Sequence, residues 1–375
     1  MAGLYIHIPF CKQACHYCDF HFSTNTQLMA DLVKAIIEEI HLQKNYLNQE
    51  IIQTIYFGGG TPSLVPASQL HEILAMIQKQ HTIADDVEIT LEANPDDLTA
   101  TNLSELKKLG VNRLSIGIQS WNTTLLTFMN RAHNAAQSQR AIDLAREAGF
   151  LNINLDLIYG VPGQTLNVLQ NDLEVLIRNS PEHISTYSLT IESKTVFDHW
   201  RRKGKFAEST EESVARQYQL IMESLSQAGF LHYEISNFAK PGFESKHNSS
   251  YWSGSKYLGV GPSAHSYDGL SRQFNVLNNY TYVKSISEKT IPFEKEILSD
   301  KDHINEYIFT SLRTHRGCDF NKVQQKFNHD LLSQNRDYLL QLEKNQLVTF
   351  SDNLLKLTNQ GKLLADKITS DLFVS

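Results

Sequence analysis

The chain has 375 residues, of which 41% are hydrophobic and 20% charged, and 34 Lys and Arg stand against 41 Asp and Glu. The net charge of −7 argues against an extended phosphate-binding surface, so we expect no nucleic-acid partner. The sequence shows no apolar run of the roughly 18 residues that a membrane-spanning helix needs, and no signal peptide at the amino-terminus. We therefore expect a cytoplasmic protein with one large and one small domain.

Three cysteines near the amino-terminus form the most specific motif. An apolar stretch over residues 4–10 leads into Cys11, Cys15 and Cys18, which have C-x3-C-x2-C spacing. Thiolates this close in sequence can converge on one metal centre. Fe–S clusters are normally held by four protein thiolates, so three would leave one iron of a [4Fe–4S] cluster open to bind a substrate.

Two other interpretations of these cysteines stay open. A Cys3His zinc site could use His7, His16 or His21, although zinc sites usually pair two close ligands with a distant second pair, which this sequence lacks. A disulfide framework is typical of small secreted domains rather than of a chain this long. Cys318, the fourth cysteine, lies far along the chain and is expected to be an ordinary small residue.

Six apolar, strand-like runs alternate with segments of helical periodicity in the first part of the chain. The predicted strands are 4–9, 54–57, 87–93, 113–119, 153–159 and 184–189. The predicted helices are 32–40, 68–80, 101–109, 135–148, 166–177 and 210–228. Six β–α units in a row imply parallel strands with right-handed crossovers. Because a complete TIM barrel has eight units, we predict an α/β fold with a partial (βα)6 TIM-like barrel; a doubly wound sheet is the alternative.

Unusual residues fall at or near the carboxyl ends of these strands, where barrels bind ligands. A glycine run at 58–60 follows the second strand, and glycine lets backbone N–H groups come close to a ligand. A plain tight turn would use the same residues. Glu92 ends the third strand, Gln119 ends the fourth, and Asp156 lies in the fifth. Carboxylates are usually surface residues, but this shared position favours a function.

Beyond the barrel, residues 233–239 are predicted to form a further strand, followed by segments rich in aromatic residues and glycine at 247–252 and 257–267. Residues 285–302 are charged and without periodicity, which predicts a linker. The rest is predicted to hold helices at 304–313, 321–327 and 331–345, strands at 347–350 and 354–357, and a final helix after Thr358. This pattern indicates a small, mainly helical, winged-helix-like domain. We expect a barrel domain with its extension at 1–285 and a small C-terminal domain at 300–375.

Several motifs together resemble one family. They are YIHIPFC at 5–11, CHYC at 15–18, GGGTP at 58–62, EANP at 92–95, SIGIQS at 115–120, DLIYGVPGQ at 156–164, YEISNFAKPG at 233–242 and HNSSYW at 247–252. They resemble the radical S-adenosylmethionine (SAM) relatives of oxygen-independent coproporphyrinogen III oxidase, and most closely their haem-chaperone branch, the HemW family. The resemblance covers nearly the whole chain. It implies a [4Fe–4S] cluster whose open iron binds the amino and carboxylate groups of SAM.

The resemblance also implies roles for individual residues. The cluster ligands would be Cys11, Cys15 and Cys18. The amino and carboxylate end of SAM would meet backbone groups of Gly59, Gly60 and Thr61. The rest of the SAM site would be lined by Glu92, Gln119, Arg131 and Asp156, with Tyr5 and Tyr17 beside them. Carboxylates can accept hydrogen bonds from ribose hydroxyls, and Arg suits a carboxylate.

The HNSSYW stretch resembles the chaperone branch, which is associated with haem. The resemblance implies that His247 ligates haem iron and that Asn248, Tyr251 and Trp252 belong to the haem site. From the residues alone, His247 and Asn248 could equally make structural hydrogen bonds while the aromatic residues fill the core. His265 is a rival ligand.

One position departs from the oxidases. They carry a further cysteine two residues after the third cluster ligand, and here that position is Phe20. We therefore favour a haem chaperone that lacks coproporphyrinogen oxidase activity; the oxidase and a zinc-binding protein are the alternatives. The implied partners are haem and haem-acceptor proteins, including acceptors at the membrane. For the assembly, a homodimer is the alternative to a monomer.

Overall fold

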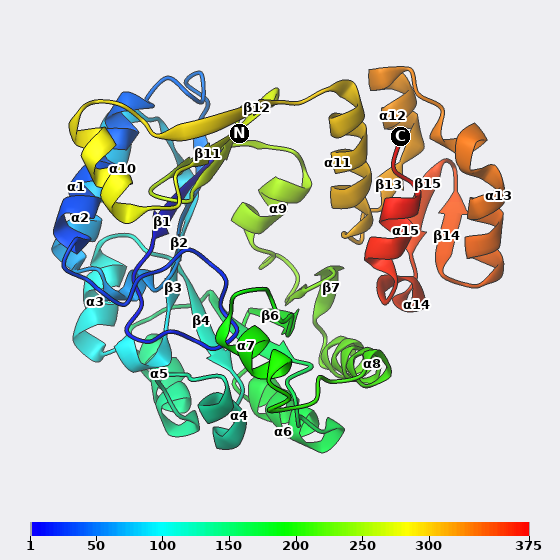
Figure 1. The fold of residues 1–375 in the computed structure, drawn as a ribbon, viewed down its shortest axis with the longest axis horizontal. Coiled ribbons are helices and arrows are strands. Elements are labelled where there is room, and N and C mark those ends of the chain that lie inside the picture. Colours follow the sequence, from blue (N-terminus) through cyan, green and yellow to red (C-terminus); the bar gives the residue numbers. More distant parts are fainter. Residues whose placement is uncertain (1, 375) are drawn as a thin grey trace.

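In the computed structural model, which describes residues 2–374, a mixed sheet of 12 strands runs through the larger part of the chain (Figure 1). At its centre, six parallel strands lie side by side in sequence order: β1 (Ala2–Ile8), β2 (Ile52–Gly59), β3 (Ile83–Ala93), β4 (Arg113–Gln119), β5 (Ile153–Tyr159) and β6 (His183–Ser188). The helices that follow them are α1 (Met29–Leu42), α2 (Ala67–Gln80), α3 (Ala100–Lys108), α5 (Ala135–Glu147), α6 (Leu166–Arg178) and α8 (Glu211–Gln227).

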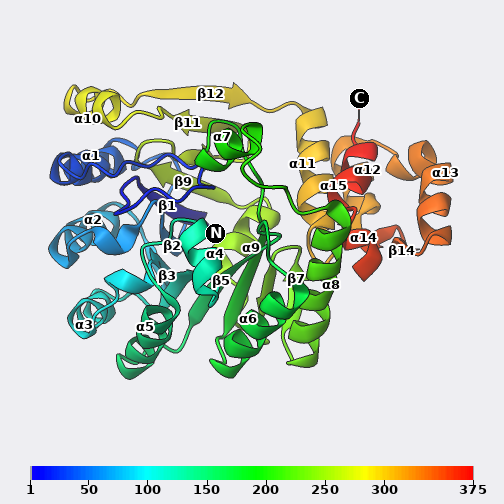
Figure 2. The same cartoon turned by 60° about the horizontal axis from the view of Figure 1, so that its bottom comes forward.

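These six helices lie along the outer face of the sheet, as Figure 2 shows. The arrangement is the predicted partial (βα)6 barrel, and a doubly wound sheet would need helices on both faces. On β1, Leu4, Ile6 and Ile8 are fully buried in the cluster that holds the apolar face of α1, whereas Tyr5 and His7 alternate with them and face the interior. The outer side of the strands thus forms the apolar core, and the inner side is free for polar residues.

Shorter elements sit between the barrel units. They are η1 (Pro62–Leu64), η2 (Pro95–Asp97), α4 (Thr123–Phe128) and α7 (Val196–Arg202). The last two were not predicted, because helices of six or seven residues carry little periodic signal. They pack together through Phe128 and Phe197, whose ring centroids are 4.7 Å apart.

The sheet extends beyond the barrel on both sides. Next to β6 come β8 (Asn237–Ala239) and β7 (Leu231–Glu234), both antiparallel to their neighbours. Next to β1 come β9 (Lys256–Val260), which is parallel to it, and then the antiparallel strands β10 (His265–Tyr267), β11 (Ser271–Asn275) and β12 (Phe293–Ile297). Between these strands lie α9 (Lys246–Trp252) and α10 (Asn279–Ser287).

The predicted linker at 285–302 is wrong. The segment contains the end of α10 and the whole of β12, which pairs with β11, and the next helix begins at Asp300. All five residues of β12 are exposed, and three of them are charged. Charged residues on an edge strand prevent pairing with other chains, and they also hid the strand from a search for apolar runs.

Glu39 ties this extension to the barrel. The side chain is fully buried on α1 and accepts hydrogen bonds from Gln43, Asn275, the Gly261 N–H and the Tyr282 hydroxyl. A buried carboxylate is tolerated only when it is paired or hydrogen-bonded. The position of β9 to β11 against α1 therefore depends on this network.

The C-terminal part forms a separate apolar cluster over residues 304–372. Its elements are α11 (Asp300–Leu312), β13 (Cys318–Asp319), α12 (Phe320–Phe327), α13 (Leu331–Lys344), β14 (Val348–Ser351), β15 (Leu354–Leu357), α14 (Asn359–Lys362) and α15 (Ala365–Asp371). Cys318 is fully buried in this cluster. This C-terminal part contacts the barrel extension through a hydrogen bond of 2.9 Å from the Ile235 N–H to the Arg313 carbonyl. Among residues 2–374, every helix is too short or too polar to cross a membrane.

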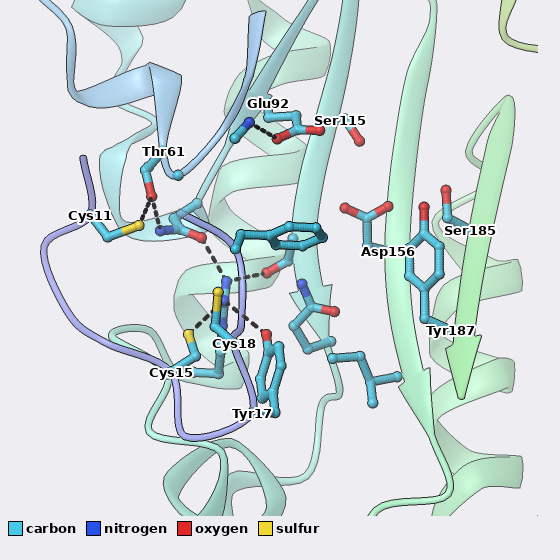
Figure 3. A pocket seen from close by; sticks show the side chains of 18 of the residues that line it. Cys11, Cys15, Tyr17, Cys18, Thr61, Glu92, Ser115, Asp156, Ser185 and Tyr187 are labelled. Carbon is cyan, nitrogen blue, oxygen red and sulfur yellow. Dashed lines mark hydrogen bonds between the residues drawn. The ribbon is translucent and has the colours of Figure 1, made fainter. Parts of the chain in front are cut away.

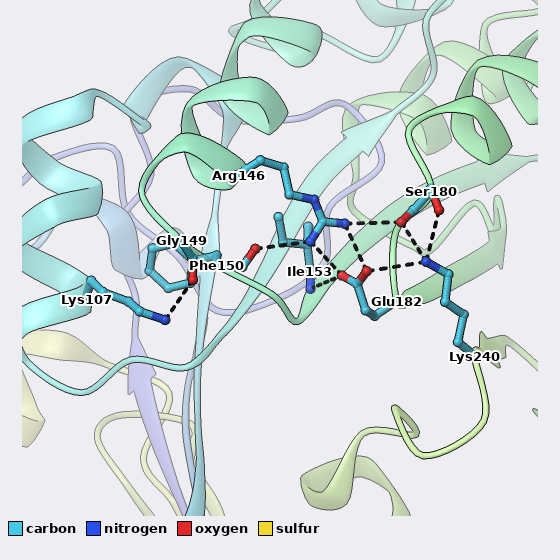
Figure 4. Close-up of polar contacts among 8 residues, drawn as sticks. All are labelled: Lys107, Arg146, Gly149, Phe150, Ile153, Ser180, Glu182 and Lys240. Carbon is cyan, nitrogen blue, oxygen red and sulfur yellow. Dashed lines mark hydrogen bonds and ion pairs between the residues drawn. The ribbon is translucent and has the colours of Figure 1, made fainter.

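A second polar network joins the amino ends of β5 and β6 (Figure 4). Glu182 accepts two hydrogen bonds from Arg146, at 2.8 and 3.1 Å, and one from the Ile153 N–H at 3.1 Å. The ammonium of Lys240 lies 3.4 Å from the same carboxylate. One side chain therefore joins α5, the start of β5 and the segment after β8.

We expect Glu182→Ala to lower the free energy of unfolding by about 2–4 kcal/mol, because it leaves a half-buried guanidinium and a backbone N–H without partners. Chemical denaturation with a circular dichroism readout measures this change. The matched control is Glu147→Ala, an exposed carboxylate at the end of α5, for which we expect a change within about 0.5 kcal/mol. Equal stabilities of the two variants would contradict the assignment.

Candidate functional site

A cavity of about 470 Å³ opens inside the barrel, on the side of the cysteine segment (Figure 3). The predicted site residues that line it are Cys11, Cys15, Tyr17, Cys18, Gly59, Gly60, Thr61, Glu92, Gln119, Arg131, Asp156 and Asn248. The remaining ones, Tyr5, His247, Tyr251 and Trp252, lie outside its lining. The structure thus brings residues from distant parts of the chain to one space, and what they bind stays a prediction.

The cysteines lie on an irregular segment that follows β1. All three are free thiols and are partly exposed. The Thr61 hydroxyl donates to Cys11 Sγ at 3.5 Å, and Arg131 Nη1 donates to Cys15 Sγ at 3.2 Å. In the described part of the chain, no three His, Cys, Asp or Glu side chains lie close enough to hold a single metal ion. The three thiols therefore face a shared space rather than one ion-sized point.

Burial raises the pKa of the Cys18 thiol to about 12, and the neighbouring thiols add to this effect. A thiol must lose its proton to ligate a metal. Loading of a metal cluster at this site would therefore release protons.

Arg131 holds the cysteine segment against the barrel. Its Nη1 reaches Cys15 and, at 3.3 Å, the Tyr17 hydroxyl. Its Nη2 donates to Asn94 Oδ1 at 2.6 Å and to the Gly117 carbonyl at 2.9 Å. One guanidinium thus links the cysteine segment to the ends of β3 and β4.

The glycine run at 58–60 packs closely against the backbone that leads into the cysteine segment. A Cβ at Gly60 would lie 2.7 Å from the Phe10 carbonyl oxygen, so no larger residue fits there. The N–H groups of Gly60 and Thr61 donate to the carbonyls of Ile8 and Phe10, at 2.8 and 2.7 Å. Contrary to our expectation, these N–H groups are thus used within the protein and are not offered to a ligand.

Glu92 is held at the end of β3 by two donors. The Tyr56 hydroxyl donates to Oε1 at 2.7 Å, and the Gly59 N–H donates to Oε2 at 3.2 Å. Burial raises the pKa of Glu92 to about 7, and the Asp156 carboxylate adds to this shift. The carboxyl group therefore changes its charge near neutral pH.

Asp156 and Gln119 face the same cavity from β5 and β4. Asn154 Nδ2 donates to Asp156 Oδ1 at 2.7 Å, and burial raises the pKa of this carboxyl group. Figure 3 shows Asp156 beside Ser185 and Tyr187 of β6. Gln119 has a left-handed backbone with φ +67°, and its Oε1 atom is buried without a partner among the described residues. The free amide oxygen of Gln119 and the remaining acceptor positions of the Asp156 carboxylate can accept hydrogen bonds from a polar ligand.

His247 is buried behind the cavity, with 1% of its surface exposed. Its Nδ1 bonds Thr54 Oγ1 and its Nε2 bonds the Tyr251 hydroxyl, both at 2.8 Å. Its ring stacks on Tyr56, with centroids 4.9 Å apart. Burial lowers the pKa of His247 to about 3, and Arg113 adds to this shift. His247 is therefore neutral at physiological pH, and both ring nitrogens are occupied in this conformation.

Sequence reasoning missed several lining residues, namely Tyr56, Arg113, Ser115, Asn154, Ser185 and Tyr187. The signal was present in β4, where residues 113, 115, 117 and 119 all line the cavity. Successive side chains of a strand point to opposite faces. Polar or small residues at every second position of a buried strand therefore mark a polar barrel interior.

Family models and related proteins match most of this chain. Residues 5–176 match the Radical SAM superfamily, and residues 298–364 match the HemN C-terminal domain. A heme chaperone HemW from Bacillus subtilis is 38% identical over 371 residues, which cover 98% of each chain. A heme chaperone HemW from Lactococcus lactis is 35% identical over 365 residues, which cover 97% of this chain and 95% of that protein.

Among solved structures, the coproporphyrinogen III oxidase HemN from Escherichia coli, a radical SAM enzyme, has a TM-score of 0.86. The match covers 100% of this chain and 90% of that chain at 23% sequence identity, so it shows the fold alone. The family follows from the closer relatives, which align over nearly their whole length. The chain belongs to the heme chaperone HemW family of radical SAM proteins.

Proposed function

We propose that this protein binds haem and delivers it to haem-dependent proteins, and that its cavity holds a [4Fe–4S] cluster together with SAM. The observation that carries the proposal is the placement of Cys11, Cys15 and Cys18 around one cavity in a chain so similar to proteins named heme chaperones. We further propose a cytoplasmic location, a C-terminal domain at 300–375 that follows the barrel domain and its extension through β12, and membrane-bound proteins among the acceptors. A homodimer is part of the same proposal.

The donor set fits a cluster. Three thiols reach the cavity, and Thr61 and Arg131 already donate hydrogen bonds to two of the sulfur atoms. Hydrogen bonds to sulfur and a nearby positive charge stabilise the anionic thiolates of an Fe–S centre. When bound, the cluster would supply an iron with an open coordination position for SAM.

The residues around the cysteines fit SAM. Glu92 and Asp156 would accept hydrogen bonds from the ribose hydroxyls, and Gln119 has a free amide oxygen for a further polar group. Because the N–H groups of 59–61 are used within the protein, the carbonyl oxygens of this run would meet the amino group of SAM. Arg131 and Tyr17 would close the side next to the cluster, and Tyr5 would act indirectly by stacking on Tyr56.

For haem, we keep His247 as the proposed iron ligand. A neutral imidazole is the form that binds iron, and the lowered pKa keeps His247 neutral. Ligation requires that a ring nitrogen gives up its hydrogen bond to Thr54 or Tyr251, so the His247 side chain must change its contacts when haem binds. Asn248, Tyr251 and Trp252 would then surround the macrocycle. Asn248 already lines the same cavity as the three cysteines, which supports this proposal.

The first prediction concerns the cluster. Anaerobically reconstituted protein should contain about four irons per chain and show broad Fe–S absorption. Replacement of Cys11, Cys15 or Cys18 by Ala should abolish this absorption, because each removes one of three ligands. Cys318→Ala is the matched control and should keep the cluster, since its thiol is buried in the C-terminal part. Loss of the cluster in the control alone would refute the assignment.

A further prediction concerns SAM. Asp156→Ala should weaken SAM binding by roughly 10- to 100-fold, because a hydrogen bond to a charged group contributes about 1.5–3 kcal/mol. Isothermal titration calorimetry on reconstituted protein measures the affinity. Asp143→Ala, an exposed carboxylate on α5, should bind SAM as the wild type does. An unchanged affinity in Asp156→Ala would count against a SAM site at the end of β5.

The haem prediction separates the two histidines. His247→Ala should shift the Soret band or weaken haem binding, since the axial ligand sets the electronic character of the iron. His265→Ala removes an exposed imidazole on β10 and should leave the spectrum unchanged. The Fe–S absorption of each variant reports whether it is folded.

The same reconstituted sample should bind haem and leave coproporphyrinogen III unchanged in the presence of SAM and a reductant. If both histidine variants keep the haem spectrum of the wild type, His247 is excluded as the ligand. Decarboxylation of coproporphyrinogen III without haem binding would favour the oxidase instead.

A further inference from the structure

Arg113 is a buried cation whose N–H groups have no acceptor in the part of the chain that the structure describes. It is the first residue of β4, is 1% exposed and reaches the cavity wall. Its side chain forms no hydrogen bond and no ion pair with any residue from 2 to 374, and its Nε is buried without a partner. Burial of an unpaired charge is costly. The guanidinium is therefore placed for a partner that the protein does not supply.

Two further polar groups of this region lack a hydrogen-bond partner among the described residues, one of them buried and the other partly exposed. Thr90 pairs with Arg113 across β3 and β4, and its hydroxyl is buried without a partner among residues 2–374. Asn248 lines the cavity from α9, and its side-chain amide makes no hydrogen bond within the same part of the chain. Arg113 and Asn248 line the same cavity and both carry N–H donors, and planar guanidinium and amide groups suit a carboxylate.

The positive charge of Arg113 acts on two acidic residues of the cavity, since it opposes the upward shift in the pKa of Glu92 and of Asp156, but neither carboxylate contacts the guanidinium directly. Glu92 and Asp156 also line the cavity, yet neither forms an ion pair with Arg113 within the described residues. Glu92 is instead engaged by Tyr56 and Gly59, and Asp156 by Asn154.

The carboxylate of SAM is also expected elsewhere. Arg131 places the cysteine segment at the Gly117 end of β4. The backbone of Arg113 lies at the opposite end of this strand from Gln119, about 20 Å away at roughly 3.3 Å per residue. In the proposed function the amino acid end of SAM lies at the cluster, so its carboxylate is far from the start of β4. The N–H groups of Arg113 are therefore free for an acceptor on another molecule.

We propose that Arg113, with Asn248, binds a carboxylate of the second ligand of the cavity, which is a propionate of haem. This inference rests on the proposed haem function and adds a specific anchor to it. Haem carries an iron and two carboxylates, and Asn248 directly follows the proposed iron ligand His247. A propionate on Arg113 would therefore fix the orientation of the haem that His247 binds.

The experiment compares ferric haem with its dimethyl ester, in which both carboxylates are blocked, on the full-length protein with its cluster reconstituted. In the wild type, the ester should bind roughly 10- to 100-fold more weakly than haem, because it cannot form the charged hydrogen bonds. In Arg113→Met, the affinity for haem should fall to that of the ester, and the affinity for the ester should stay unchanged. Asn248→Ala should reduce the difference between the two ligands in part.

The control is Arg140→Met on the outer face of α5, which should keep the wild-type difference between haem and ester. Thermal unfolding of Arg113→Met should show no loss of stability in the absence of ligands, because an apolar side chain of similar size replaces an unpaired buried charge. If Arg113→Met does not fold, Arg113→Gln provides the same comparison.

Two results would overturn the proposal. In the first, Arg113→Met or Arg113→Gln prefers haem over its ester by the same factor as the wild type does. The other is a loss of SAM affinity in these variants with unchanged haem binding, which would assign Arg113 to SAM. A wild-type protein that binds neither haem nor ester would instead refute the haem function itself, so the two failures are distinguishable.

Discussion

The cysteine segment has no regular secondary structure of its own, so its position depends on a few polar contacts with the barrel. Arg131 supplies the most central of them, because one guanidinium bonds Cys15, Tyr17, Asn94 and the Gly117 carbonyl. The segment is further pressed onto β2 at Gly60, where only glycine leaves room for the Phe10 backbone. Together with backbone hydrogen bonds such as that from the His16 N–H to the Met129 carbonyl, these contacts hold the three thiols at one space.

A polar interior sets this barrel apart from TIM barrels, whose interior is filled by branched apolar side chains. Here the apolar core lies between the strands and the outer helices, and β1 shows the division with Leu4 and Ile6 outside and Tyr5 and His7 inside. Buried polar groups cost free energy unless they are bonded. Most of them are bonded to one another, as His183 is to Asn154 and Tyr233. The few that lack partners mark the places where a ligand can contribute to stability.

The repeating part of the fold could be predicted because each strand of the barrel is an apolar run and each following helix has a clear period. The extension of the sheet, β9 to β12, could not be predicted in this way. Its edge strand β12 is exposed and charged, and β9 pairs with β1 although the two strands are far apart in the sequence. The strand-end residues Glu92, Gln119 and Asp156 were found from position alone. Arg113 was missed because an isolated basic residue at the start of a strand looks like a surface residue until its burial is known.

The haem and SAM sides of the cavity share one chain of contacts. His247 stacks on Tyr56, the Tyr56 hydroxyl donates to Glu92, and Glu92 accepts from the N–H of Gly59 in the glycine run. If His247 leaves its place to bind iron, Tyr56 loses the ring that covers it, and the position of Glu92 is less constrained. Coupling between two sites acts equally in both directions. A ligand that fixes Glu92 therefore also favours the buried position of His247, so the two proposed ligands of this protein cannot bind as independent events.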